Sequence, residues 1–236
     1  MGEIYLIRHG QSIFTRGNFD RLSEIGTKQM EILGGYLARL GVKPDAIYAG
    51  SMRRQVVAAK LMMAKLMGES EPRPLIVPEF SEMDVTKIVT TFTPALLADD
   101  PAVMEDSANM YRDRAVLQKL IERSLIKWLY NKRDDHFYIK ESYGQFASRV
   151  KAGLDRVIGE CGEGKKVIIV SSFGPIGVVA KMALNLTDED AIRMSFATRN
   201  SSISVFDYSD QGISLRSFNS TAHLELEGDP ELITVR

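Results

Sequence analysis

An arginine, a histidine and a glycine stand together directly after the first apolar run of the chain. Residues 3–8 are rich in isoleucine, leucine and tyrosine, a pattern that predicts a buried β-strand ending at Arg8. Ligands of α/β proteins bind outside the carboxyl ends of parallel strands. Arginine offers a fork of donors that suits phosphate, and a neutral imidazole can act as a nucleophile. Arg8, His9 and Gly10 therefore predict phosphoryl transfer through a phosphohistidine, with Gly10 letting a ligand approach the backbone.

A plain structural interpretation of the same residues stays open at this point. Arg8 would then only end the strand, and His9 would be a turn residue. Short motifs match by chance, so Arg-His-Gly alone does not decide between the two interpretations. The other strand ends of the chain have to decide it.

Two further predicted strands end in residues suited to the same chemistry. The strand at 45–49 leads into a helix that begins near Arg53 and Arg54. Cations are unfavourable beside the positive end of a helix dipole, whereas an anion is bound well there. The strand at 75–77 leads to Glu82, and a carboxylic acid near a phosphate ester could protonate the leaving oxygen. The alternative is that these side chains are solvated surface groups.

The order of the predicted elements indicates an α/β fold. Strands alternate with helices at the start and again after residue 140, which predicts a three-layer α/β/α sandwich with a mostly parallel central sheet. We expect one domain over residues 1–236, with a helical cap or lid inserted at about 85–140. The expected strands are 3–8, 45–49, 75–77, 166–170, 202–207 and 213–219. The clearest expected helices are 23–40, 52–67, 108–131, 142–160 and 175–184.

Composition limits the classes of partner and compartment. The net charge of −1 gives no general attraction to nucleic acid or to an anionic membrane surface. Cys161 is the one cysteine, so an intrachain disulfide is impossible, and a reducing compartment fits. The N-terminus does not resemble a signal peptide, and no apolar run reaches the ~18 residues of a membrane span. We therefore expect a cytoplasmic protein. The last strand, 213–219, offers an edge at which a homodimer could form.

Several motifs in order resemble those of the histidine phosphatase superfamily, the phosphoglycerate-mutase-like enzymes. The resemblance runs nearly from end to end and is carried by the ordered set of motifs. These are Arg8-His9-Gly10-Gln11-Ser12, Leu22-Ser23-Glu24-Ile25-Gly26-Thr27-Lys28-Gln29, Tyr48-Ala49-Gly50-Ser51-Met52-Arg53-Arg54 and Phe80-Ser81-Glu82. Weaker landmarks are Glu141-Ser142, Asn200-Ser201-Ser202-Ile203 and Phe218-Asn219 with His223-Leu224.

The resemblance implies a site and a reaction. His9 would be the catalytic nucleophile and Glu82 the catalytic proton donor, acting on a phosphorylated small molecule. The residues that would bind phosphate are Arg8, Arg54, Gln11, Ser12 and Ser172. Neither a metal nor another cofactor is implied, because the arginines supply the positive charge. The expected activity is that of an acid-type phosphoric monoester hydrolase, and mutase activity is less expected because a mutase must exclude water.

The chain departs from the family pattern at one important place. The family reads Ser-His-Gly-Gly after the strand at 166–170, whereas this chain reads Ser171-Ser172-Phe173-Gly174. Ser172 stands where the family has its second catalytic histidine, and a serine carries no charge. Losing one preorganised donor commonly costs about 10²–10³ in rate. Thr15 also stands where many members have a phosphate-contacting asparagine.

Two hypotheses from different classes follow. In the first, the chain is a phosphatase that uses His9, and Ser172 or another histidine completes the pocket. In the second, the fold is kept, turnover is impaired, and the chain binds a phosphorylated ligand or a protein. His136 and His223 are expected to be solvated and structural respectively, although either could replace the lost imidazole. The apolar content of 79–140 favours a ligand other than a small sugar phosphate.

Overall fold

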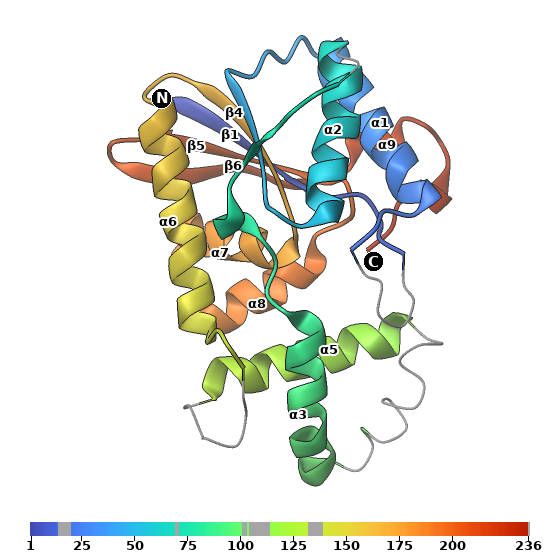
Figure 1. The fold of residues 1–236 in the computed structure, drawn as a ribbon, viewed down its shortest axis with the longest axis vertical. Coiled ribbons are helices and arrows are strands. Elements are labelled where there is room, and N and C mark those ends of the chain that lie inside the picture. The colour runs from blue at the N-terminus through green and yellow to red at the C-terminus, as the bar shows by residue number, and fades with distance from the viewer. Residues whose placement is uncertain (14–19, 69–70, 101–102, 104–113, 132–138, 236) are drawn as a thin grey trace.

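A six-stranded sheet forms the centre of the molecule (Figure 1). The computed structural model describes residues 1–13, 20–68, 71–100, 103, 114–131 and 139–235. The strand order is β3-β2-β4-β1-β5-β6; the first four are parallel, and β5 and β6 add an antiparallel hairpin. The mostly parallel sheet predicted from the sequence is thus confirmed. The strands are β1 (Gly2–Arg8), β2 (Ala46–Ala49), β3 (Leu75–Ile76), β4 (Lys166–Ser171), β5 (Ile203–Ser209) and β6 (Gly212–Ser220).

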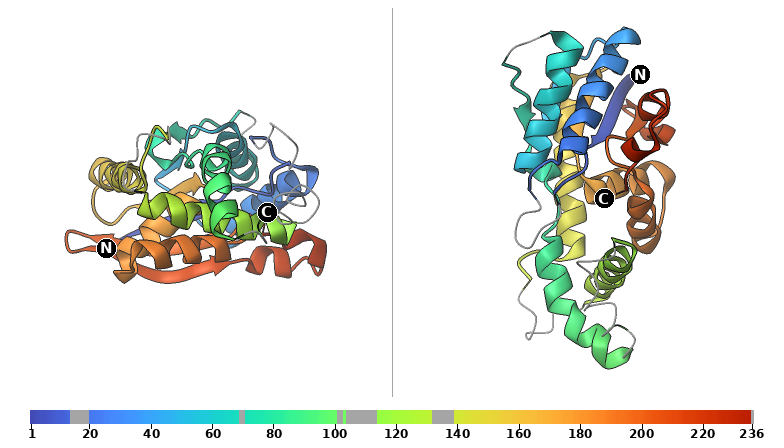
Figure 2. Two further views of the ribbon diagram at one scale, coloured as in Figure 1. Left: turned by 90° about the horizontal axis from the view of Figure 1, so that it is seen from below. Right: turned by 90° about the vertical axis from the view of Figure 1, so that its right-hand side faces the viewer.

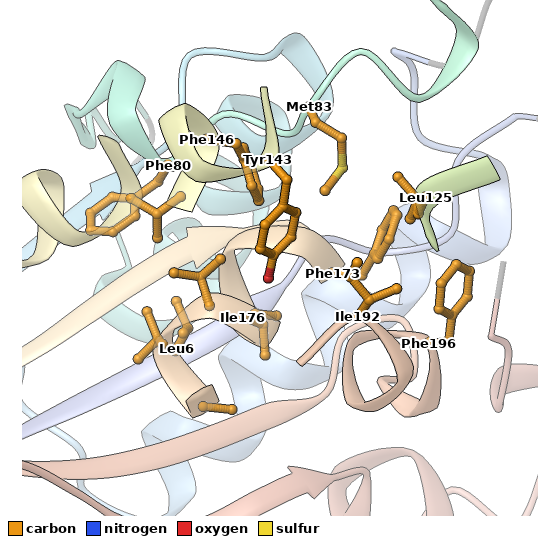
Figure 3. Packing of buried hydrophobic residues seen from close by; sticks show 14 of the residues in the cluster. Leu6, Phe80, Met83, Leu125, Tyr143, Phe146, Phe173, Ile176, Ile192 and Phe196 are labelled. Carbon is orange, nitrogen blue, oxygen red and sulfur yellow. The ribbon is translucent and has the colours of Figure 1, made fainter. Parts of the chain in front are cut away.

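Helices cover both faces of the sheet, because the central strands are apolar on both sides. Ile4 and Leu6 of β1 face α6 (Tyr143–Cys161) and α7 (Phe173–Leu184), whereas Ile7 faces α1 (Glu24–Arg39) and α2 (Arg53–Met67). Figure 2 shows these layers from two other directions. Figure 3 shows the buried hydrophobic residues on the α6 and α7 side of the sheet, among them Leu6, Phe146 and Ile176. The α/β/α layering is confirmed.

Local sequence signals explain where several helices begin and end. Ser23 precedes α1, and its hydroxyl accepts a hydrogen bond from the Gly26 amide. Gly41 follows this helix with φ 67°, the left-handed conformation that glycine adopts freely. Ser142 caps α6 in the same way, and this helix has a fully buried apolar face made of Phe146, Val150, Leu154 and Val157.

Two long helices, α3 (Val85–Asp99) and α5 (Arg114–Tyr130), pack against each other beyond the sheet (Figure 1). Helix α3 begins at Val85, because Asp84 caps its first turn through the Lys87 amide. Pro94 lies inside α3. The predicted helical start at 108–113 and the loop histidine His136 lie outside the described residues.

The C-terminal quarter contains structure that the sequence pattern did not predict. Helix α8 (Asp188–Ala197) is capped by Thr187 and packs on α7, and α9 (Ala222–Glu225) is a single turn. Near the C-terminus, Leu232 is buried in the short 3-10 helix η2 (Pro230–Leu232), and its carbonyl accepts a 2.7 Å bond from Gln29 Nε2. Within the described parts of the chain, no helix is both long and apolar enough to cross a bilayer.

Candidate active site

The backbone after β1 is fixed from three directions. The His9 amide donates to the Ser171 carbonyl at 2.9 Å, and the His9 carbonyl accepts from the Ser201 amide at 3.2 Å and from Asn200 Nδ2 at 3.4 Å. Gly10 lies against α1, where an added Cβ would come within 2.2 Å of the Gly26 carbonyl oxygen. The histidine therefore sits on a rigid element rather than on a mobile loop.

The imidazole of His9 is held as a neutral ring with a defined proton position. Nδ1 lies 2.7 Å from the Gly10 carbonyl, which can only accept, so Nδ1 carries the hydrogen. Nε2 then has a lone pair, which accepts from Arg54 Nε at 3.1 Å. Burial lowers the pKa of His9 well below its ordinary range, and the charges of Arg54 and Arg8 lower it further. Neutral imidazole is the form required of a nucleophile.

Arg54 is oriented by an aspartate that the sequence analysis did not single out. The Asp20 carboxylate accepts from the Arg53 and Arg54 amides at 3.0 and 3.1 Å and from Arg54 Nη1 at 3.3 Å. It therefore caps α2 and holds the guanidinium at the same time. Asp20 comes from a polar loop 34 positions before Arg54, so no local pattern pointed to it.

We expect Asp20→Ala to lower the free energy of unfolding by about 1 kcal/mol, the usual cost of losing a helix cap. It should also raise KM for a phosphorylated substrate, because Arg54 loses one of the contacts that hold it. Urea denaturation and steady-state kinetics measure the two effects separately. Unchanged stability and unchanged KM together would contradict this role for Asp20.

Arg8 lies under an aromatic ring. One of its Nη atoms donates to the Thr198 carbonyl, and its Cζ lies 5.7 Å from the centroid of the Phe173 ring. Phe173 in turn packs against Phe196, with ring centroids 5.5 Å apart (Figure 3). Phe173, which replaces the family's glycine, thus forms a cation–π contact with Arg8, one of the residues predicted to bind phosphate.

Glu82 lies in the segment before α3, and its buried carboxyl contacts the first turn of α7. Its two oxygens accept from the Gly174 amide at 3.1 Å and from the Met83 amide at 3.2 Å. A Cβ on Gly174 would lie 2.2 Å from Oε1, so glycine is required for this approach. Burial raises the pKa of Glu82, and this effect outweighs the lowering by Arg54, the two amides and Arg8. A raised pKa keeps a proton on the carboxyl to higher pH.

Five of the seven predicted site residues line one cavity of about 520 Å³ at the carboxyl ends of the parallel strands. These are Arg8, His9, Ser12, Arg54 and Glu82. The Ser12 hydroxyl is buried there and has no hydrogen-bond partner among the described residues. Asp20 and Asn200 also line the cavity and were missed. No group of three or more His, Cys, Asp or Glu side chains in the described chain is arranged to hold a metal ion.

The structure does not bring Gln11 and Ser172 to the cavity wall. The side-chain oxygen of Gln11 accepts from the Ser23 hydroxyl, and its backbone amide donates to Gln29 Oε1. These two bonds hold the loop behind His9. Ser172 is fully buried, and its Oγ accepts from Gln55 Nε2 at 2.9 Å. Gln55 also donates to the Phe80 carbonyl, so it links α2, β4 and the segment that carries Glu82.

His223 lies outside the cavity in a structural position. Its Nε2 is 2.9 Å from the Ser201 hydroxyl, its ring packs on Tyr36, and burial lowers its pKa to about 4. Ser201 has the strained φ of 62° and donates its amide to His9. His223 therefore supports the turn behind His9 and lies outside the cavity that His9 lines.

The strand ends of the parallel sheet converge on a buried histidine, two arginines and a carboxyl. This arrangement defines the class of protein, an α/β protein with an anion site at its strand ends. The family model of the Histidine phosphatase superfamily (branch 1) matches residues 4–116 and 99–221, so the chain belongs to this family. No curated protein sequence matches the chain.

Solved structures share the fold at low identity. Phosphoglycerate mutase from Bacillus anthracis has a TM-score of 0.67 at 17% identity, covering 96% of each chain. A mutant phosphoserine phosphatase from Entamoeba histolytica, in complex with phosphoserine, has a TM-score of 0.61 at 17% identity, covering 95% of this chain and 100% of that chain. A mycobacterial glucosyl-3-phosphoglycerate phosphatase in complex with inorganic phosphate has a TM-score of 0.62 at 16% identity, covering 94% of this chain and 98% of that chain.

Proposed function

We propose that the chain is a phosphomonoesterase that works through a phosphohistidine on Nε2 of His9. The observation that carries the proposal is the tautomer of His9: Nδ1 donates to Gly10, so the Nε2 lone pair faces Arg54 and the cavity. A phosphate monoester bound between Arg54 and Arg8 would place its phosphorus in front of that lone pair.

In the first step, Nε2 attacks phosphorus while the bond to the leaving oxygen breaks. Arg54 Nε must release Nε2 for this attack, and the dianionic phosphoryl oxygens offer it a stronger, charge-assisted acceptor. The arginines balance the charge on the phosphoryl oxygens, so no metal ion is required by the proposal. Protonated Glu82 gives its proton to the leaving oxygen, which departs as an alcohol.

In the second step, water hydrolyses the phosphohistidine. Glu82, now a carboxylate, accepts a proton from the water as its oxygen attacks phosphorus and the N–P bond breaks. Inorganic phosphate leaves, and His9 and Glu82 return to their starting protonation states. The cavity mouth gives water access to the intermediate, which favours hydrolysis over transfer to a second alcohol.

The pH dependence of kcat/KM follows from the two shifted pKa values. The lowered pKa of His9 keeps the nucleophile neutral well into the acid range, and the raised pKa of Glu82 keeps the acid protonated above its ordinary range. We expect activity to be highest at acid pH and to fall as pH rises through the pKa of Glu82. Glu82→Gln should remove this fall and lower kcat by about 10²-fold or more for an alkyl phosphate.

The Glu82→Gln effect should be much smaller for p-nitrophenyl phosphate, because p-nitrophenolate leaves without a proton. The comparison of the two substrates therefore separates a proton donor from a residue that only shapes the pocket. Equal losses on both substrates would assign Glu82 to positioning instead.

The direct test of the proposed function is p-nitrophenyl phosphate hydrolysis in the presence of a chelator between pH 5 and 8. Intact-mass spectrometry of rapidly quenched protein should show one added phosphoryl group during turnover. Failure to turn over aryl or alkyl phosphates under these conditions would contradict the proposal.

A second candidate function is phosphate-ligand or protein binding with impaired turnover. It is favoured by Ser172, which is buried away from the cavity and gives the phosphoryl group no charged donor. Gln55 occupies the space beside its hydroxyl, so a larger side chain needs room. An inactive wild type together with activity in the Ser172→His, Gln55→Ala double variant would establish this alternative.

A further inference from the structure

The cavity extends well beyond the phosphoryl end, and this part of its wall is apolar. Val85 and Val89 come from one face of α3, and Leu117 and Ile121 come from one face of α5, each pair four residues apart. Val89, Leu117 and Ile121 are at most 9% exposed. The Phe173 ring closes the same wall next to Arg8. A cavity of about 520 Å³ has the size of a site for a drug-sized ligand, far more than one phosphate group needs.

The polar groups on this wall are not suited to an anionic leaving group. Thr90 lines the cavity, but its hydroxyl lies 2.9 Å from the Thr86 carbonyl and donates within its own helix. Asp84 adds negative charge to the lining, whereas the charge of Asp20 is paired with Arg54. Among the described lining residues, the cations are Arg8 and Arg54, which both belong to the phosphoryl end.

A carboxylate on the leaving group would therefore lose its hydration without gaining a cationic partner from the described wall, whose hydroxyls offer only neutral hydrogen bonds. Burying an unpaired charge costs free energy, and Asp84 adds like-charge repulsion. An apolar leaving group would instead release water from the apolar wall of the cavity, which is favourable. These opposite effects discriminate between two classes of phosphomonoester that carry the same phosphoryl group.

We propose that the substrate is the phosphomonoester of a bulky apolar alcohol, aryl or branched alkyl, with no carboxylate near the ester oxygen. The proposal rests on the proposed phosphatase function of the same site. It separates this chain from the Entamoeba histolytica relative, whose structures contain phosphoserine and 3-phosphoglyceric acid.

The first experiment compares kcat/KM for 1-naphthylmethyl phosphate with kcat/KM for phosphoserine, because both are esters of alkyl alcohols that need a proton to leave. We expect a preference of about tenfold or more for the naphthyl ester, the usual range for apolar groups in a hydrophobic pocket. If kcat/KM for phosphoserine equals or exceeds that for the naphthyl ester, the proposed substrate class is overturned and the phosphatase function stays intact.

A binding experiment tests the substrate class independently of turnover. Calorimetric titration with 1-naphthylmethylphosphonate and with the phosphonate analogue of phosphoserine measures affinities for compounds that cannot be hydrolysed. Tighter binding of the naphthyl compound supports the proposed class even if no ester is hydrolysed, in which case only the phosphatase function fails. Equal or weaker binding of the naphthyl compound overturns the class.

A pair of variants on α3 tests whether the preference for the naphthyl compound depends on the apolar wall. Thr90→Lys introduces a cation at an exposed lining position, and Thr91→Lys makes the same change one residue further on, outside the lining. We expect Thr90→Lys to reduce the preference for the naphthyl compound severalfold and Thr91→Lys to leave it unchanged. The same preference in both variants would place the leaving group elsewhere and overturn the proposal.

Discussion

Replacing His9 with alanine is expected to abolish the phosphoprotein intermediate and to lower kcat/KM by about 10³-fold or more. The variant removes the lone pair that Arg54 faces and little else. The backbone of residue 9 is held by its own amide and carbonyl, through Ser171 and Ser201, so the loop keeps its path without the imidazole. Quenched-protein mass spectrometry and steady-state kinetics with p-nitrophenyl phosphate measure the two losses.

His223 provides the matched control, because it is a second buried histidine that does not line the cavity. His223→Asn should lower the melting temperature, since the contact with the Ser201 hydroxyl is weakened, while the phosphoprotein still forms. Ser201 keeps its bonds to the Gln29 carbonyl and to His9, which preserves the turn. Phosphoprotein formation in His9→Ala would assign the nucleophile to another residue and end the proposal.

The core of the candidate site was readable from the sequence because its members lie at strand ends. Arg8 ends β1 and His9 follows it, Arg54 lies in the first turn of the helix after β2, and Glu82 follows β3. The topology of a parallel sheet brings these positions to one edge, whatever the loops between them do. The strands were predicted to within about two residues. For the central parallel strands β1, β2 and β4, the signal is the apolar run of a strand buried in a parallel sheet.

The parts that were missed depend on contacts between distant segments. Asp20 caps a helix that begins at Arg53, and Gln55 reaches Ser172 across 117 positions. Neither residue has a local pattern that differs from that of an ordinary polar side chain. Helix α8 was missed because Thr187 and its acidic first turn were not recognised as a helix start. Ser172 and Gln11 were expected to bind phosphate by resemblance, and only the packing around Gln55 and Gln29 shows that they lie behind the wall.

Arg54→Ala should lower kcat/KM by about 10²–10³-fold, the usual cost of removing one preorganised group that stabilises transition-state charge. Arg53→Ala is the matched control, because Arg53 is the neighbouring residue on α2, is exposed and does not line the cavity. Helix α2 should persist in both variants, since Asp20 caps it through backbone amides that alanine retains. Kinetics with p-nitrophenyl phosphate at saturating and limiting substrate distinguishes lost binding from lost catalysis.

The pKa of His9 gives a second readout that a merely structural role of Arg54 would not move. Arg54 lowers this pKa by its charge and by donating to Nε2, so Arg54→Ala should raise it, while burial and Arg8 keep it below the ordinary value. Titration of the imidazole by NMR should therefore show a higher pKa in Arg54→Ala and no shift in Arg53→Ala. The acid limb of kcat/KM should move in the same direction. An activity loss without a change in the pKa of His9 would mean that Arg54 acts on the phosphoryl group alone, and that its contact with the nucleophile is incidental.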